Sequence, residues 1–343
     1  TLDTLKMAEN GSFLDLTEKL SSDGEFKKED YYDIFDAGQI EGKQYLMPLG
    51  FCVSYLLTTE EKLSEAGAEV DSGQTGEGIF GMISQTAEKN DSAHSAAHCL
   101  YQITPASVLY DQLRLTNVDI LDYKNKEMMV EKDIFQKYAD DAKLLYGQYE
   151  KSLTILKEYS RDLVGAFSKV TFFSSRDQIG FNARYYDSIF EQGLGQDMKL
   201  LMYPNQDNPA GRSANIVLYG GITSGSENVE EGYQLLRIAL DCNYGVSSED
   251  LPMKKENMKA IVEDLCKNKG KQNVSIGVES VSIDRMDEEL GNEIIEQLNN
   301  LSHGSISNQG ILGIMEDTMT DYITGSKDFD SCYSEMENKI QLY

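Results

Sequence analysis

The stretch GKQYLMPLGFCVSYLL, residues 42–57, decides how the rest of the chain is organised. An apolar strand begins at residues 45–47 and resumes at residues 51–57. Pro48 and Gly50 interrupt it, because proline cannot donate to a strand ladder and glycine weakens one. A strand that is broken and then continued predicts a passage between two bodies rather than the interior of a single sheet.

Predicted strands and helices alternate on either side of this stretch, which indicates an α/β architecture. The predicted strands cover residues 170–173, 200–203, 215–219 and 274–281. The predicted helices cover residues 60–67, 79–88, 227–240, 288–301, 311–323 and 329–343, with a long amphipathic helix or helix pair through residues 135–156. The 343 residues fit two domains of ordinary size. Since no low-complexity linker separates them, we expect the chain to pass between the domains more than once.

Composition excludes several classes of function. Lys and Arg number 31 against 58 Asp and Glu, so the net charge is −27. This charge argues against binding to nucleic acid, which needs a basic face, and against docking on anionic lipid. No apolar run approaches the roughly 20 residues of a membrane span. Because the chain opens on Thr1 rather than Met, we expect that its start has been trimmed.

The five cysteines are scattered, and no two form a Cys-x-x-Cys pair. This pattern predicts neither a disulfide framework nor a zinc knuckle, so we interpret most of them as free buried thiols. They are Cys52, Cys99, Cys242, Cys266 and Cys332.

Three patterns imitate chemical motifs. Gly76, Gly78 and Gly81 match a dinucleotide fingerprint by spacing, but no strand is predicted before them. His94 and His98 have metal-ligand spacing if they lie on a helix, and we interpret that segment as a surface helix instead. Adjacent acidic residues are common in so acidic a chain and do not form the opposed carboxylates of a glycosidase. The sequence therefore predicts no cofactor, no metal site and no catalytic residue.

Four short elements occur in the order typical of one family. They are NGSFLDL (residues 10–16), GKQYLMP (42–48), ANIVLYGG followed by SEN (214–221 and 226–228), and YITGSK with the terminal helix (322–327 and 329–343). On these elements the chain resembles the extracellular solute-binding proteins of bacterial ABC importers, in the carbohydrate, maltodextrin-binding-like branch. It departs from the family in having no Pro-x-Thr-Trp element and no Trp at all, and in carrying Thr58-Thr59 where Tyr-Asn is usual.

The resemblance implies a two-lobe, periplasmic-binding-protein-like fold of type II, with a hinge and a cleft between the lobes. The family's first strand–helix–strand unit is missing, which we interpret as truncation of the N-terminal unit. The expected segments are lobe 1 at residues 1–50 and 220–276 and lobe 2 at residues 54–216 and 283–343, with crossings near residues 49–53, 217–220 and 275–282.

A cleft for polyols needs aromatic faces for the sugar ring and polar side chains for its hydroxyls. The chain offers 20 Tyr and 12 Phe for the first purpose. The candidate ligand-binding residues at the crossings and strand ends are Phe51, Cys52, Ser174, Arg176, Asp177, Tyr219, Gly220 and, in the polar loop at residues 303–309, Asn308. Family position adds Asp3 and Tyr101.

The resemblance implies a non-catalytic, monomeric receptor outside the cell, secreted and lipid-anchored. It would bind a small solute, a sugar or oligosaccharide, and deliver it to an ABC transporter permease by hinge closure. Two alternatives stay open: a carbohydrate-active hydrolase, and the same receptor fold binding a peptide, polyamine or anion. A cleft lined by carboxylates would favour a cation, and one centred on Arg176 would favour an anion.

Overall fold

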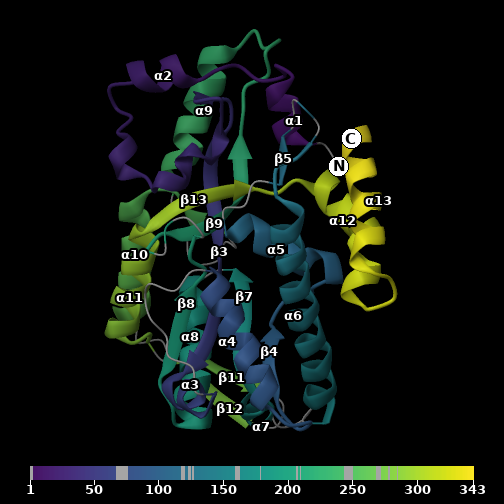
Figure 1. The fold of residues 1–343 in the computed structure, drawn as a ribbon. Coiled ribbons are helices and arrows are strands. Elements are labelled where there is room, and N and C mark those ends of the chain that lie inside the picture. Colours follow the sequence, from purple (N-terminus) through teal and green to yellow (C-terminus); the bar gives the residue numbers. More distant parts are fainter. Residues whose placement is uncertain are drawn as a thin grey trace.

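A computed structural model gives the fold of the protein (Figure 1). It describes residues 3–66, 76–116, 120–122, 125, 127–158, 163–177, 179–205, 208, 210–242, 250–267, 272–276, 279–283 and 285–343. The α-helices are α1 (Thr4–Glu9), α2 (Thr17–Ser22), α3 (Glu60–Ala66), α4 (Gly76–Lys89), α5 (Pro105–Leu115), α6 (Lys132–Glu158), α7 (Leu163–Ser168), α8 (Ile179–Ile189), α9 (Val229–Asp241), α10 (Lys255–Lys267), α11 (Glu288–Asn299), α12 (Gln309–Ile323) and α13 (Phe329–Leu342).

Short helical turns and strands complete the secondary structure. The turns are the 3₁₀ segments η1 (Lys28–Asp30) and η2 (Asp33–Gly38) and the π segment η3 (Phe190–Leu194). The strands are β1 (Gln39–Ile40), β2 (Lys43–Gln44), β3 (Met47–Thr59), β4 (Ser95–Cys99), β5 (Leu121–Asp122), β6 (Glu127–Met128), β7 (Val170–Asp177), β8 (Met198–Met202), β9 (Arg212–Gly220), β10 (Leu251–Pro252), β11 (Gln272–Ile276), β12 (Glu279–Ile283) and β13 (Leu301–Ile306).

Strand β3 is the axis of the molecule, and all of its residues are buried. Its first part, up to Cys52, pairs antiparallel with β9 and β10, and its second part, from Val53, pairs antiparallel with β7 and β8. The register with β9 shifts on either side of Gly50, so Pro48 and Gly50 produce a bulge inside one continuous strand. The change of partners falls within the predicted passage at residues 49–53.

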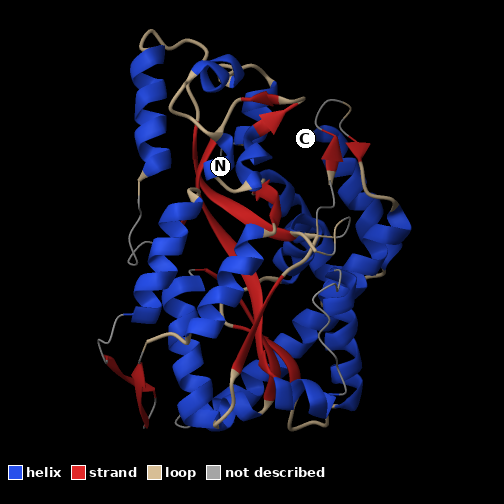
Figure 2. Cartoon of the chain, turned by 90° about the vertical axis from the view of Figure 1, so that its left-hand side faces the viewer, coloured by secondary structure: helices blue, strands red, loops and turns tan. Residues whose placement is uncertain are grey.

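The helices form two groups along this axis (Figure 1). We call the upper lobe the group that contains α1, α2 and α9 with the β1–β2 hairpin, and the lower lobe the group that contains α3 to α8 with β4, β7 and β8. Helices α12 and α13 pack against α5 and α6 and share their apolar core. The longest sheet has the order β13-β9-β3-β7-β4. Figure 2 shows its strands running through the middle of the molecule with helices on both sides.

One apolar core runs through both lobes. It contains Leu16 and Tyr32 of the upper lobe, Phe173 and Leu200 of the lower lobe, and the apolar side chains along β3 between them. A second core lies under α4, α5, α6, α12 and α13. The long helix predicted from the stripe at residues 135–156 is confirmed as the single helix α6. The predicted segment boundaries of the two lobes stay predictions.

The strand predicted at residues 274–281 is wrong. The structure has an antiparallel hairpin there, β11 and β12, with Val274 opposite Val281. Apolar and polar residues alternate through both arms, so the pattern does not mark the reversal of direction. The chain therefore does not cross between lobes along a strand at residues 275–282. Strand β13 instead joins α11 to α12 and runs parallel to β9, so residues 303–306 of the predicted polar loop are a strand.

Two of the three patterns that imitate chemical motifs do not have the secondary structure that those motifs require. His98 lies in strand β4 rather than on a helix, so the helical spacing to His94 does not exist. Its ring is buried, lies 2.6 Å from Ser152 Oγ through Nδ1 and stacks on Tyr149. The glycines at 76, 78 and 81 lie within helix α4. No helix in the described ranges combines the length and the apolarity that crossing a membrane requires.

Candidate functional site

The two parts of β3 meet where β9 and β7 flank it. Cys52 pairs with Asn215 of β9, and Ser54 pairs with Arg176 of β7. Residues two apart on a strand point to the same face of the sheet. The pairing therefore brings Asn215 and Arg176 to one face of the junction, each from a different flanking strand.

Helix α5 supplies the charged residues that join these two. Asp111 accepts hydrogen bonds through one oxygen from Arg114 Nη2 at 2.7 Å and through the other from Arg176 Nη1 at 3.1 Å. Arg114 also donates through Nη1 to Asn215 Oδ1. We call the chain Arg176–Asp111–Arg114–Asn215 the junction network. It links β7, α5 and β9 at the point where the two lobes meet.

Local sequence explains why α5 begins where it does. Thr104 is the N-cap, its side chain accepts from the backbone N–H of Ser107, and the Ser107 hydroxyl completes the capping box. Pro105 occupies the first turn, where a missing N–H is tolerated. Asp111 and Arg114, three residues apart, then lie on the same face of the helix and pair with each other.

Burial and charge act against each other in the junction network. Burial disfavours the charged guanidinium of Arg114, but Asp111 and the phenol of Tyr110 outweigh it and raise the pKa of Arg114 above its ordinary value. Burial raises the pKa of the Cys52 thiol, while the positive charges of Arg114 and Arg176 act to lower it. Two guanidinium groups share the single carboxylate of Asp111, so the network carries a net positive charge in a protein of net charge −27.

A cavity of about 380 Å³ opens beside this network. We call it the junction cavity. Its charged lining residues are Asp111, Arg114, Arg176 and Glu316. Its neutral polar lining residues are Gln102, Thr104, Ser107, Asn215, Ser307 and Gln309. A cleft with several hydroxyl and amide groups and few charges suits a ligand rich in hydroxyl groups.

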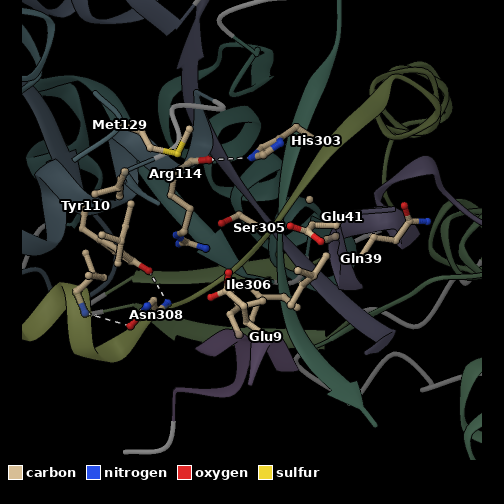
Figure 3. Close-up of a pocket in the computed structure, with 17 residues that line it drawn as sticks. Glu9, Gln39, Glu41, Tyr110, Arg114, Met129, His303, Ser305, Ile306 and Asn308 are labelled. Carbon is tan, nitrogen blue, oxygen red and sulfur yellow. Dashed lines mark hydrogen bonds between the residues drawn. The ribbon is translucent and has the colours of Figure 1, made fainter. Parts of the chain in front are cut away.

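A larger cavity of about 590 Å³ lies alongside it, and Tyr110 and Arg114 line both. Figure 3 shows β13 crossing this cavity, which we call the β13 cavity: Tyr110 and Arg114 of α5 lie on one side of the strand, and Gln39 and Glu41 of the upper lobe lie on the other. His303 Nε2 lies 3.2 Å from the backbone oxygen of Arg114. The two cavities together form a cleft between the lobes.

Asn308 forms hydrogen bonds to several helices at one end of this cleft. Its side chain caps α12, accepting from the backbone N–H groups of Gly310 and Ile311, and its own N–H donates to the hydroxyl of Tyr110. Its Nδ2 donates to Asp3 at 3.0 Å, and the Tyr343 hydroxyl donates to the same Asp3 oxygen. Helices α1, α5, α12 and α13 therefore meet at this residue.

Several predicted site residues lie at the cleft. Cys52 and Arg176 line the junction cavity, and Asn308 lines the β13 cavity. The ring of Tyr101 lies under the Arg176 guanidinium at 5.0 Å, and its hydroxyl is hydrogen-bonded to the buried Ser174. Asp3 reaches the cleft through its bond to Asn308. The backbone of Asp177 pairs with Val53, and its side chain lies outside the described residues.

Three predicted contacts have other surroundings. Phe51 is fully buried and packs edge-to-face on Tyr32 at 5.4 Å, so it serves the core rather than a ligand. The Tyr219 hydroxyl donates to Thr4 at 3.1 Å, and Tyr219 lines neither cavity. A Cβ on Gly220 would lie 2.5 Å from Leu236, so this glycine allows α9 to approach β9 closely rather than giving a ligand access to the backbone.

The sequence reasoning did not find Asp111, Arg114, Asn215 or Tyr110. One signal was present: Asp111 and Arg114 are an oppositely charged pair at helical spacing inside the mostly apolar run VLYDQLRL, residues 108–115. Nothing in the sequence showed that this face of the helix would turn toward the junction. Within the described residues, no group of three His, Cys, Asp or Glu side chains is placed to hold a metal ion.

Several solved structures have a similar architecture. The sugar-binding protein MalE from Xanthomonas citri superposes with a TM-score of 0.62 and 13% identity over 98% of this chain and 80% of that one. A sugar transporter protein from Rhizobium etli, in an open conformation, gives a TM-score of 0.61 and 12% identity over 98% and 82%. An ABC substrate-binding protein from Listeria monocytogenes in complex with cycloalternan gives 0.54 and 12% over 99% and 82%.

The chain has the periplasmic-binding-protein fold. At these identities the superposition establishes the fold, and the predicted two-lobe α/β architecture with an interlobe cleft is confirmed. In this periplasmic-binding-protein fold, the junction network occupies the region where the lobes join. No family model matches the sequence, and no curated protein matches it.

Proposed function

We propose that the protein is a non-catalytic receptor that binds a small carbohydrate in the cleft between its lobes. The observation that carries the proposal is the cleft itself: hydroxyl and amide groups line the junction cavity beside a few charged groups, and the adjoining β13 cavity adds apolar side chains and further polar ones. The fold supports it, since similar folds occur in a sugar-binding protein and in a cycloalternan complex.

We further propose that the receptor works outside the cell, anchored by lipid, and hands its solute to an ABC transporter permease. Closure of the lobes around the solute would be the signal, because a ligand that contacts both lobes stabilises the closed arrangement relative to the open one. Residues of both lobes line the β13 cavity, among them Glu9 of α1 and Arg114 of α5.

A thermal-shift screen of the purified protein against mono- and oligosaccharides, amino acids and polyamines tests the proposal. A saccharide that binds only the folded protein stabilises it by RT ln(1 + [L]/Kd), so the melting temperature rises with the logarithm of its concentration once this exceeds the Kd. Chromatography of the incubated saccharide should show it unchanged. A cleaved product would identify a hydrolase instead, and a response confined to amino acids or polyamines would contradict the carbohydrate assignment.

A further inference from the structure

The junction cavity has a charge pattern that a neutral sugar does not use. Both oxygens of Asp111 are engaged, one by Arg114 and one by Arg176. The Arg114 side chain is enclosed, with 5% exposure, whereas the Arg176 side chain is 42% exposed and lines the cavity. The positive charge that Asp111 does not neutralise is therefore accessible at Arg176.

Arg176 is also held in place for binding. Its Nη1 is fixed by Asp111 at 3.1 Å, and its guanidinium lies 5.0 Å from the centre of the Tyr101 ring. A planar guanidinium that is already oriented loses little freedom when it binds a carboxylate. Asn215, beside the same network, accepts from Arg114 Nη1 and is hydrogen-bonded to the Cys52 thiol. The exposed guanidinium of Arg176 carries only donors, which call for an acceptor-rich ligand.

We propose that the solute is an acidic saccharide, a uronic acid or an oligosaccharide that contains one, whose carboxylate binds Arg176 in the junction cavity. This inference rests on the proposed function and narrows its substrate class. The neutral hydroxyl and amide groups of the same cavity would bind the sugar hydroxyls. An accessible guanidinium beside hydroxyl and amide groups, with the exposed Glu316 elsewhere on the wall, matches a polyol that places a single carboxylate next to Arg176.

The other acidic residues of the cleft determine which end of the saccharide lies in which cavity. Glu316 is exposed and accepts a hydrogen bond from Thr104 Oγ1 at 3.1 Å. Glu9 and Glu41 line the β13 cavity, where Arg114 is the cation on the wall shared by both cavities. The carboxylate therefore belongs next to Arg176, and the neutral part of the saccharide extends toward the β13 cavity.

Calorimetric titration with matched pairs tests the inference: glucose against glucuronate, galactose against galacturonate, and disaccharides with and without a uronate. We expect the acidic member of at least one pair to bind about 10- to 100-fold tighter, as a hydrogen bond to a charged group allows. Because Arg176 is partly exposed, added salt should reduce this preference.

Three variants assign the preference to the junction cavity. Arg176→Gln should abolish it, and Glu316→Gln should increase it, because the first removes an attractive charge and the second a repulsive one. Lys267→Gln is the matched control: it also removes one positive charge, but from an exposed ion pair with Glu263 on α10. This control should leave the ratio of the affinity for the acidic saccharide to that for its neutral partner unchanged.

The outcomes separate the inference from the proposed function. Neutral saccharides that bind as tightly as their acidic partners, or an acid preference that survives Arg176→Gln, would overturn the acidic-saccharide assignment while the receptor function stands. Failure of every saccharide, neutral and acidic, to bind would overturn the proposed function itself. Binding of inorganic phosphate or simple carboxylates as tightly as the uronates would show an anion site without sugar recognition, which also contradicts the inference.

Discussion

At the scale of single residues, the junction network shows how a buried charge is kept in an acidic protein. Arg114 is enclosed and its ion-pair partner is Asp111, while Asp111 is also bonded to Arg176. Removing one member of a buried pair costs more than the pair contributes, because it leaves an uncompensated charge. The two members of this pair should therefore respond unequally to substitution.

We expect Asp111→Asn to lower the free energy of unfolding by about 3–5 kcal/mol, because it leaves the Arg114 charge buried without a carboxylate. Arg114→Met should cost less, since Asp111 keeps Arg176 as a partner. Urea denaturation of the two variants under identical conditions compares these values. An equal or larger loss in Arg114→Met would contradict this description of the network.

Some residues at the cleft could be predicted from the sequence, and others could not. Cys52, Arg176 and Asn308, which line the two cavities, were predicted because strand ends and polar loops are recognisable in sequence, and their contact with a ligand stays a prediction. Asp111 and Arg114 were not, because the burial of a charged helix face depends on the elements that pack against it. Phe51 was misassigned for the converse reason, since an aromatic residue in an apolar strand looks the same whether it faces a ligand or the core.

At the scale of elements, long regular segments were predictable and short ones were not. Strand β3 and helix α6 carry their pattern over many residues, so the sequence predicts both. The β11–β12 hairpin and strand β4 at His98 were misread, because a few residues fit more than one periodicity. The β1–β2 hairpin, which brings Gln39 and Glu41 to the β13 cavity, depends on a close backbone approach that no periodicity reveals.

Gly38 is the residue that permits this approach. A Cβ at Gly38 would lie 1.8 Å from the backbone oxygen of Leu46 and 2.7 Å from Gln44 Nε2, so the hairpin would have to shift. We expect Gly38→Ala to destabilise the protein by about 3 kcal/mol and to weaken ligand binding. Gly313 in α12 has open space around its Cα.

Gly313→Ala is therefore a control of opposite sign, because alanine replaces glycine inside an unobstructed helix and should add about 0.5–1 kcal/mol. Thermal unfolding of both variants gives the comparison. Two alanine variants with similar melting temperatures would show that the backbone at Leu46 shifts without cost in stability.

At the scale of the whole molecule, the excess of acidic groups makes stability depend on pH. Asp187 of α8 shows the effect most directly: burial, and then the nearby carboxylates of Glu191, Asp287 and Asp197, raise its pKa to about 6. Between about pH 4 and pH 6, the Asp187 carboxyl is therefore protonated in the native state and ionised in the unfolded chain. The stability from Asp187 is present below about pH 4 and is lost as the pH rises through about 6.

We expect Asp187→Asn to raise the free energy of unfolding by about 2–3 kcal/mol at pH 8 and to have little effect at pH 4. Asparagine keeps an oxygen for the backbone N–H of Asp287 without carrying a charge. Chemical denaturation of wild type and variant across this pH range measures the difference. A constant offset at every pH would mean that packing, not ionisation, is responsible.

The continuity of β3 has a consequence for how the molecule comes apart. The same fully buried strand belongs to both lobes, and the apolar cluster around it has members in each. Neither lobe can unfold while the other keeps its apolar core buried. Scanning calorimetry should record one heat-absorption peak whose van't Hoff enthalpy equals the calorimetric enthalpy. Two resolved peaks would mean that the two lobes unfold independently, although they share β3.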